Sequence, residues 1–200
     1  MKTNSIKLLV LFLFSSILTI NAQTPQNPED ISPLLIGEKL PDAILLNENG
    51  EFINLNEEIA KKNTVLVFYR GGWCPYCNMQ LAGLAESEAD ILKLGYQIIA
   101  VSPDDYKNLK PSVEKNKTTY KLYSDADGSF IKNIGIGFTP SSGTTAYIAK
   151  KTIGKTTDVL PVPTVLVLNK NGEILFEYIS PNYKQRISPE LLLAVLKNLK

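Results

Sequence analysis

The sequence predicts an α/β domain with a mixed central sheet, helices on both faces of the sheet and an N-terminal β-hairpin. Two continuous apolar runs, TVLVFY at 64–69 and YQIIAVS at 96–102, have the β-branched and aromatic content of buried central strands. A segment with helical spacing of apolar residues lies between them, and strands that alternate with helices indicate a parallel core. A late strand pair around Asn171-Gly172 adds antiparallel strands, so the sheet is expected to be mixed.

The other elements follow from local signals. Asn49-Gly50 predicts the turn of the first hairpin, and Gly95 is expected to end the long helix that starts near residue 74. Pro103 is expected in the first turn of a helix capped by residues 102–105, and Ser188 is expected to cap the last helix. Shorter elements are expected at 56–62 (helix), 120–125 (strand) and 128–136 (helix), and 139–160 is expected to be an inserted loop with one short helix.

The N-terminus has the layout of a secretory signal peptide. Two lysines precede an apolar run of 13 residues from Leu8 to Ile20, which is shorter than the ~20 residues that span a bilayer. We expect residues 1–22 to be removed after Ala22, residues 23–34 to form an extended tether, and residues 35–200 to form one domain. The protein is therefore expected to be exported, to a bacterial periplasm, with no membrane contact after cleavage; an uncleaved anchor helix is the alternative.

Composition excludes several classes of function. The formal net charge of +1 gives no basic field for nucleic acid or anionic lipid. The chain has no histidine, so it has no Ser-His or Cys-His catalytic pair and no histidine-ligated metal. Its two cysteines cannot complete a four-cysteine zinc site. We expect no metal and no cofactor.

Both cysteines lie in one short stretch, FYRGGWCPYCNMQL at 68–81. Cys74 and Cys77 follow a buried strand and precede a long helix, so they lie at a helix N-terminus, where free amides and the helix dipole stabilise a thiolate. Cys74 is expected to be the exposed sulfur, and Cys77 the shielded one with the higher pKa. Arg70 stands four residues before Cys74, either as a fixed positive charge near the thiolate or as a surface cation.

The cysteine pair has three possible interpretations. A structural disulfide over so short a loop would stabilise the fold little, since the gain grows with loop length. A metal site would have only two thiolates and no imidazole. A redox couple agrees best with the spacing and the helix N-terminus.

Four segments together resemble the peroxiredoxin-like branch of the AhpC/TSA (alkyl hydroperoxide reductase and thiol-specific antioxidant) superfamily. These segments are FYRGGWCPYC, IIAVSPD, YKLYSDADGSF and LPVPTVLVLNKNGEI. The resemblance covers residues 33 to about 180 and implies a thioredoxin-like fold.

The chain combines two patterns within that resemblance. Laid without gaps on residues 70–77, the peroxiredoxin motif Pro-x-x-x-Thr-x-x-Cys places its proline on Arg70, its threonine on Cys74 and its peroxidatic cysteine on Cys77. The arginine that peroxiredoxins carry before the late strand would fall on Pro163. Thioredoxins instead have Trp-Cys-x-x-Cys and a cis-proline, which Trp73, the two cysteines and Pro163 match. The resemblance therefore implies a cis Val162–Pro163 bond, with Arg70, Trp73, Pro163 and Thr164 shaping the site.

We expect an exported thiol–disulfide oxidoreductase, in which Cys74 attacks and Cys77 resolves a mixed disulfide. Its partners would be protein thiols or disulfides, or a thioredoxin-type reductant. One alternative is a thiol peroxidase that acts on a hydroperoxide, with Cys77 peroxidatic and Cys74 resolving. Another is a periplasmic binding domain without catalysis whose cysteines are vestigial. The inserted loop at 139–160 is expected to reach the site as a flap, or else to be a solvated surface insertion.

Overall fold

The computed structural model describes residues 24–155 and 157–199. The predicted signal peptide lies outside these residues. In chain order the elements are η1 (Pro28–Asp30), β1 (Ile44–Leu46), β2 (Phe52–Asn54), α2 (Leu55–Lys61), β3 (Asn63–Phe68), α3 (Pro75–Lys93), β4 (Tyr96–Ser102), η2 (Tyr106–Asn108), α4 (Leu109–Asn116), β5 (Lys121–Ser124), α5 (Ser129–Asn133), β6 (Gly137–Phe138), α6 (Ser142–Ala149), β7 (Leu160–Pro161), β8 (Thr164–Leu168), β9 (Ile174–Ile179) and α7 (Pro189–Asn198). Within the described ranges, no helix has the length and apolar character needed to cross a membrane.

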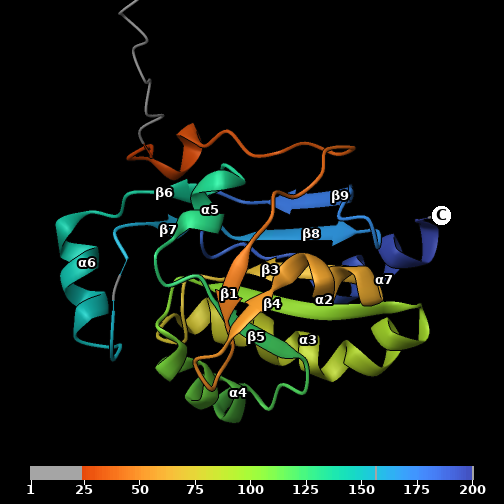
Figure 1. The fold of residues 1–200 in the computed structure, drawn as a ribbon, viewed down its shortest axis with the longest axis horizontal. Helices are drawn as coiled ribbons and strands as arrows, with labels where there is room; N and C mark the ends of the chain where they lie inside the picture. The colour runs from red at the N-terminus through yellow and green to blue at the C-terminus, as the bar shows by residue number, and fades with distance from the viewer. Residues whose placement is uncertain (1–23, 156, 200) are drawn as a thin grey trace, which may run out of the picture.

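A seven-stranded mixed sheet forms the centre of the molecule, in the order β2-β1-β5-β4-β3-β8-β9 (Figure 1). β3, β4 and β5 run parallel, and β8 pairs antiparallel with β3. The hairpin β1–β2 adds to one edge and β9 to the other. The predicted mixed sheet and N-terminal hairpin are confirmed.

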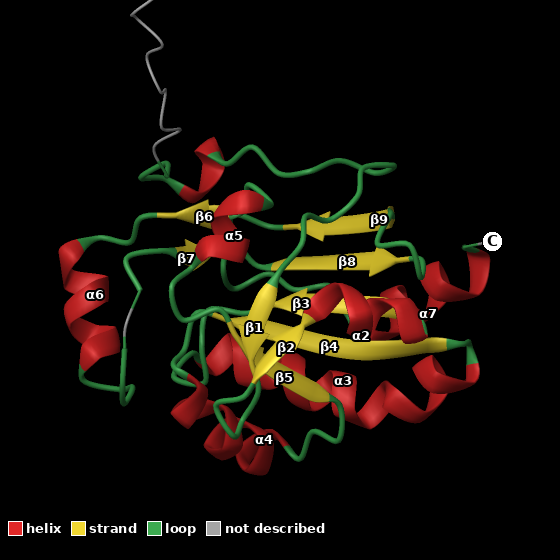
Figure 2. Cartoon of the chain, viewed as in Figure 1, coloured by secondary structure: helices red, strands yellow, loops and turns green. Residues whose placement is uncertain are grey.

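Helices cover both faces of the sheet, as Figure 2 shows. Alternate residues of each central strand point to opposite faces, because a strand has a side-chain period of two. On β3, Val65 and Val67 join the core with α3 and α7, while Leu66 and Phe68 join the core with α2 and α5. Both faces of β3 are therefore buried, which explains its continuous apolar run.

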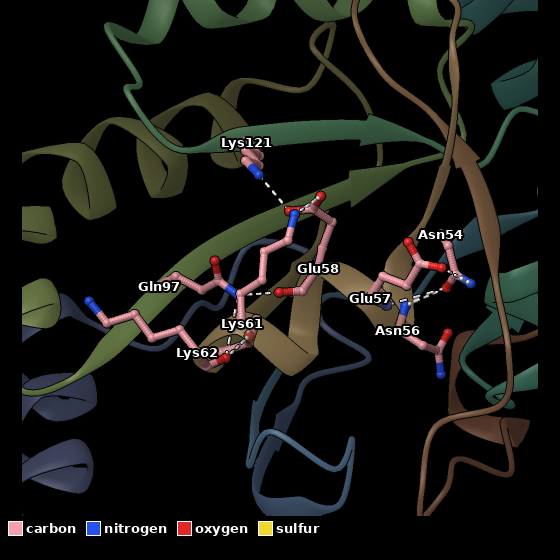
Figure 3. A network of polar contacts seen from close by, with 9 residues as sticks. Asn54, Asn56, Glu57, Glu58, Lys61, Lys62, Gln97 and Lys121 are labelled. Carbon is pink, nitrogen blue, oxygen red and sulfur yellow. Dashed lines mark hydrogen bonds and ion pairs between the residues drawn. The ribbon is translucent and has the colours of Figure 1, made fainter.

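A polar network fixes α2 at the amino ends of the parallel strands (Figure 3). The Asn54 side chain accepts from the amides of Asn56 and Glu57 and caps the helix. Glu58 pairs with Lys61 and with Lys121, which opens β5. Gln97, near the start of β4, donates to the carbonyl of Glu58 at 2.8 Å. This network lies at the sheet end opposite the cysteine turn, so its role is structural.

Two local predictions meet different outcomes. Ser188 caps α7, and its hydroxyl accepts from the amide of Leu191 at 3.2 Å, as predicted. Pro103, however, lies before the helical segment, and Asp105 is the residue that caps η2. The prediction for Pro103 was wrong because the neighbouring Asp104 is buried and turns inward to bond the cysteine turn.

The segment before the domain contacts it at two points. The amide of Thr139 donates to the carbonyl of Pro25 at 2.7 Å, and the amide of Leu34 donates to the carbonyl of Ile134 at 3.2 Å. Gly135 has a φ of +74°, and a Cβ there would overlap the Ser32 carbonyl. Residues 24–34 therefore lie along the domain surface, with one turn of 3₁₀ helix.

The inserted segment contains α6 and the short strand β7, which pairs with β6. In Figure 1, α6 stands away from the sheet, on the side where β6 and β7 lie. The Ser141 side chain caps α6 by accepting from the amide of Thr144. The predicted single short helix within 139–160 is confirmed.

Candidate active site

The cysteine turn begins where β3 ends and leads directly into α3. The amide of Tyr69 donates to the carbonyl of Val101 at 3.0 Å, which holds the chain against β4 before it turns. Gly71 then takes a φ of +141°, in a region that residues with a side chain rarely adopt. Cys74 is the N-cap of α3, and Pro75 occupies the first helical position. The predicted placement of the pair at a helix N-terminus is confirmed.

A chain of hydrogen bonds from buried polar side chains holds the cysteine turn in place. The amide of Gly72 donates to Asp104 Oδ2 at 2.7 Å, and Asn78 Nδ2 donates to the carbonyl of Gly72 at 2.9 Å. Asn116 Nδ2, from α4, donates to Asn78 Oδ1 at 3.0 Å. Asp104, Asn78 and Asn116 are all buried. Because these buried contacts bond both the amide and the carbonyl of Gly72, they fix the position of the turn.

Both cysteines are free and buried, with 1% of Cys74 and 0% of Cys77 exposed. The prediction of an exposed Cys74 was therefore wrong for this conformation. Trp73 and Tyr76 pack around the sulfurs, and Trp73 meets Tyr147 of α6 edge-on, with ring centroids 5.9 Å apart. These aromatic side chains cover a position that the turn alone would leave open.

The two thiols nevertheless have opposite electrostatic environments. A hydrogen bond from the Cys77 thiol, together with the Cys77 amide and the charges of Arg70 and Arg186, lowers the pKa of Cys74 to about 6 despite its burial. Burial raises the pKa of Cys77 well above its ordinary value, and the neighbouring Cys74 raises it further. Cys74 is therefore the thiolate at neutral pH, and Cys77 is the proton donor beside it.

Arg186 is a site residue that the sequence alone did not reveal. Its Nη2 donates to Cys77 Sγ at 3.4 Å, from the loop that precedes α7. It is one of only two arginines in the chain. That scarcity was the one available signal, because no local motif links residue 186 to residue 77.

Arg70 lies between two aromatic rings. Its guanidinium carbon is 5.1 Å from the ring centroid of Trp73 and 4.6 Å from that of Tyr183. The Tyr183 ring also meets Tyr76 edge-on at 5.7 Å. The structure thus brings Arg70 and Trp73 together with both cysteines, and adds Tyr183, which no sequence motif indicates.

Pro163 and Thr164 lie near the cysteine turn as expected, but the peptide bond before Pro163 is not cis and neither residue lines the pocket beside Cys74. Thr164 pairs with Phe68, so both residues lie at the sheet end that carries the turn. No peptide bond in the described residues is cis, so the predicted cis Val162–Pro163 bond is wrong. The backbone is held extended on both sides of this bond: the Val162 amide donates to the Ile136 carbonyl, and the Pro163 carbonyl accepts from the Ser180 amide. A trans bond, the ordinary state of X-Pro, fits that extended path.

A pocket of about 590 Å³ opens beside Cys74. Its walls come from the cysteine turn, the first turns of α6 and the loop before α7. The lining residues are Arg70, Trp73, Cys74, Pro75, Tyr76, Ser141, Gly143, Thr144, Tyr147 and Tyr183. Cys77, Pro163 and Thr164 are not among them. The inserted segment therefore reaches the cysteines, as expected of a flap.

A mixed sheet flanked by helices, with paired thiols at the N-terminus of α3, defines a thiol-dependent oxidoreductase of the thioredoxin-like fold. The chain belongs to the AhpC/TSA family, whose model matches residues 36–176. The curated relative Peroxiredoxin Bcp of Escherichia coli K12 is 25% identical over 167 residues, which cover 84% of this chain and 98% of the relative.

Solved structures agree with the fold. Reduced Prx3 of Vibrio vulnificus, crystallised in complex with H2O2, superposes with a TM-score of 0.69 at 22% identity, covering 82% of this chain and 99% of that one. Peroxidoxin BcpB of Mycobacterium tuberculosis superposes with a TM-score of 0.65 at 18% identity, covering 82% of this chain and 97% of that one.

Proposed function

We propose that the protein is an exported thiol–disulfide oxidoreductase in which Cys74 is the attacking thiolate and Cys77 the resolving thiol. One observation carries this assignment. Cys74 lines the pocket and has a pKa lowered to about 6, whereas Cys77 lies outside the lining and has a pKa raised well above its ordinary value. An attacking sulfur must be both ionised and reachable, and Cys74 is the sulfur that combines the two.

The reaction is a two-step exchange. The Cys74 thiolate attacks one sulfur of a disulfide, forms a mixed disulfide, and releases the other half as a thiolate that takes up a proton. Cys77 then loses its proton, attacks Cys74 Sγ and displaces the second half. The substrate disulfide is reduced to two thiols and the protein is oxidised to the Cys74–Cys77 disulfide. A thioredoxin-type dithiol would restore the reduced protein by the reverse exchange.

Single-cysteine variants test the order of the two sulfurs. With bis(2-hydroxyethyl) disulfide as the probe, Cys77→Ser should accumulate a stable adduct on Cys74, seen by intact mass and peptide mapping. Cys74→Ser should accumulate none. An adduct on Cys77 in the Cys74→Ser variant, with none in Cys77→Ser, would overturn the assignment. No adduct in either variant would instead support a binding domain with vestigial cysteines.

A thiol peroxidase is the second candidate, and two observations favour it. The family relatives are named peroxiredoxins, and Arg186 donates to the sulfur on which the family motif places the peroxidatic cysteine. In this reaction the Cys77 thiolate attacks a peroxide oxygen, which yields a sulfenic acid and an alcohol or water. The Cys74 thiol then condenses with the sulfenic acid, forming the disulfide and releasing water.

Peroxide consumption separates the two candidates. The raised pKa of Cys77 and the absence of an arginine at position 163 both predict slow turnover. Losing one charge-stabilising donor can cost about 10²–10³ in rate. A sulfenic acid trapped on Cys77 of Cys74→Ser by micromolar peroxide, with a wild-type kcat/KM of about 10⁴–10⁸ M⁻¹s⁻¹ as in efficient enzymes, would establish the peroxidase.

The proposed export rests on the sequence of residues 1–22, with its lysines, short apolar run and Ala22. In an oxidising compartment Cys74 and Cys77 would form a disulfide unless a reductant acts on them. Export therefore implies either a dedicated reductant for this pair or a role of the protein as an oxidant. The intact mass of the protein recovered from the producing cells tests the proposal. A mass that retains residues 1–22 would refute cleavage.

A further inference from the structure

The residues that line the pocket beside Cys74 indicate which substrates it could receive. Among the ten residues that line it, Arg70 is the one charged side chain apart from the Cys74 thiolate, and none is an aspartate or glutamate. The other walls include four aromatic residues and two aliphatic hydroxyl residues, which are Trp73, Tyr76, Tyr147, Tyr183, Ser141 and Thr144. In such a pocket the Cys74 thiolate is the nucleophile for every ligand, and Arg70 is the lining side chain that can pair with an anionic group of the ligand.

Arg70 has no carboxylate partner within residues 24–155 and 157–199, although its charge acts on the Cys74 thiolate. The three ion pairs found there involve lysines, and no described group accepts a hydrogen bond from the Arg70 side chain. Its Nε is buried and unbonded. Buried N–H donors are usually hydrogen-bonded, so an Arg70 without a carboxylate partner beside the reactive sulfur is free to pair with an anionic group of a substrate.

The two aromatic rings around Arg70 fix how a ligand could approach. Trp73 and Tyr183 both lie against the guanidinium, at 5.1 and 4.6 Å. These cation–π contacts hold the guanidinium between the two rings, and its N–H donors remain without a hydrogen-bond partner among the described residues. A carboxylate matches the edge of a guanidinium with two parallel hydrogen bonds. The rings also limit the rotamers of Arg70, so less entropy is lost when a ligand binds.

Size argues for a small molecule rather than a protein disulfide. The pocket holds about 590 Å³, within the range of small-molecule sites, while only 1% of Cys74 is exposed. A folded protein, including a thioredoxin-type reductant that restores the reduced state, would have to displace α6 and the Trp73–Tyr147 contact before it could reach Cys74. A disulfide of amino-acid or short-peptide size fits the volume of the pocket that Cys74 lines.

We propose that this pocket is a substrate site for low-molecular-weight disulfides that carry a carboxylate, with Arg70 pairing with the carboxylate while Cys74 attacks the sulfur. The inference rests on the proposed disulfide exchange and names its substrate class. The bonds formed and broken are those of that exchange: one substrate disulfide becomes two thiols, and the protein gains the Cys74–Cys77 disulfide. Arg70 is a binding residue in this scheme and transfers no proton.

Three disulfides of similar size and different charge provide the test. Dithiodipropionate is anionic, bis(2-hydroxyethyl) disulfide is neutral and cystamine is cationic. The rate of Cys74 adduct formation is measured for each in Cys77→Ser and divided by its rate with a free reference thiol, which removes intrinsic reactivity. We expect the anionic probe to react at least tenfold faster than the neutral one, and cystamine to be the slowest. Added salt should reduce the anionic preference.

Three variants assign the preference to the pocket. Arg70→Met, in the Cys77→Ser background, should reduce the anionic-to-neutral ratio to about one, and Arg70→Lys should retain part of it. The ratio is used because Arg70 also lowers the pKa of Cys74, which changes all three rates together. Gly143 lines the pocket, and a Cβ at this position would meet no atom within 4 Å. Gly143→Glu should therefore invert the ratio even if Arg70→Met does not fold.

The outcomes distinguish this inference from the proposed function. Equal corrected rates for all three probes would overturn the carboxylate site and leave disulfide exchange in place. A tenfold preference that survives in both Arg70→Met and Gly143→Glu would also overturn it. No adduct with any probe would overturn the exchange reaction and the inference together.

Discussion

Nη2 of Arg186 lies 3.4 Å from Sγ of Cys77, although 109 residues separate them in the chain. Arg70, the other arginine of the protein, lowers the pKa of Cys74 from its place between Trp73 and Tyr183. Both arginines are thus within the electrostatic reach of the redox pair. Arg70 borders the pocket from which a substrate enters, whereas Arg186 reaches the sulfur that resolves.

Replacing Arg186 should slow the resolving step. Cys77 must ionise before it attacks the mixed disulfide, and the Arg186 charge is the main influence that favours its thiolate against burial. A hydrogen bond to a charged group contributes about 1.5–3 kcal/mol, so Arg186→Gln should slow resolution by about tenfold or more. Rapid-quench experiments with bis(2-hydroxyethyl) disulfide, in proteins that retain both cysteines, would measure how fast the Cys74 mixed disulfide forms and is resolved.

Arg186→Lys is the matched control, because it keeps the charge and loses the planar fork. Its resolution rate should lie between those of the wild type and Arg186→Gln. The first step, attack by Cys74, should change less than the second in both variants. Equal slowing of both steps would show that Arg186 acts through the fold of the loop rather than through the Cys77 sulfur.

The ionisation of Cys74 should depend on the thiol of Cys77. The hydrogen bond from Cys77 is the largest influence that lowers the pKa of Cys74 to about 6. Alkylation of Cys74 by iodoacetamide should therefore rise with pH around a midpoint of about 6 in the wild type. In Cys77→Ala the donor is lost and the midpoint should move up, while Cys77→Ser keeps an O–H donor and should move it less.

Peptide mapping of the alkylated sulfur at each pH provides the measurement. An unchanged midpoint in Cys77→Ala would show that the helix N-terminus and the two arginines ionise Cys74 without help from Cys77.

Burial raises the pKa of Asp104 to about 6, with further increases from the charges of Asp105 and Cys74. The folded state therefore favours the protonated acid. That contribution to stability is complete below the ordinary value of 3.8 and is lost as pH rises through about 6. Asp104→Asn cannot titrate, and it keeps an oxygen that can accept from the Gly72 amide. From pH 4 to pH 7 the free energy of unfolding should fall less in the variant than in the wild type, and the two decreases should differ by up to about 3 kcal/mol.

Urea unfolding at the two pH values tests this expectation. Asp125 supplies an internal comparison, because burial raises its pKa to about 6 as well and its carboxylate accepts from the amides of Phe130 and Ile131, away from the turn. Asp125→Asn should reduce the pH dependence of stability without changing the alkylation of Cys74. If Asp104→Asn shows the same pH dependence of stability as the wild type, the Asp104 carboxyl group of the wild type is ionised throughout this range.

Local and periodic features of the fold could be predicted from the sequence. The strand at 96–102 was predicted at its observed bounds because a strand buried on both faces is a continuous apolar run. The Ser188 cap and the placement of Cys74 were equally local. Each depends on a few neighbouring residues, and no distant contact alters it.

The site features that the sequence did not predict correctly depend on contacts between distant segments. Arg186 reaches Cys77 through the path of the loop before α7, which no spacing rule describes. The pocket beside Cys74 depends on the position of α6, because Tyr147 lines it and contacts Trp73. The prediction of a cis Val162–Pro163 bond rested on a resemblance to thioredoxins. The bond is trans, and hydrogen bonds of Val162 and Pro163 to other segments hold the backbone on both sides of it. These properties required the three-dimensional arrangement.

The inserted segment should control how large a molecule can reach Cys74. Tyr147 is the residue of α6 that touches Trp73, and both line the pocket. Removing this ring with Tyr147→Ala should open the roof of the pocket and leave the sulfur chemistry unchanged. The reaction of Cys74 with a bulky aromatic disulfide reagent such as dithionitrobenzoate should therefore accelerate more than its reaction with iodoacetamide, by about threefold to tenfold in the ratio of the two rates. Ile153→Ala, on an exposed residue of the same segment, is the matched control and should leave the ratio at its wild-type value. Equal ratios in wild type and Tyr147→Ala would show that α6 is a surface insertion with no influence on access, and the size argument for a small substrate would then lose its basis.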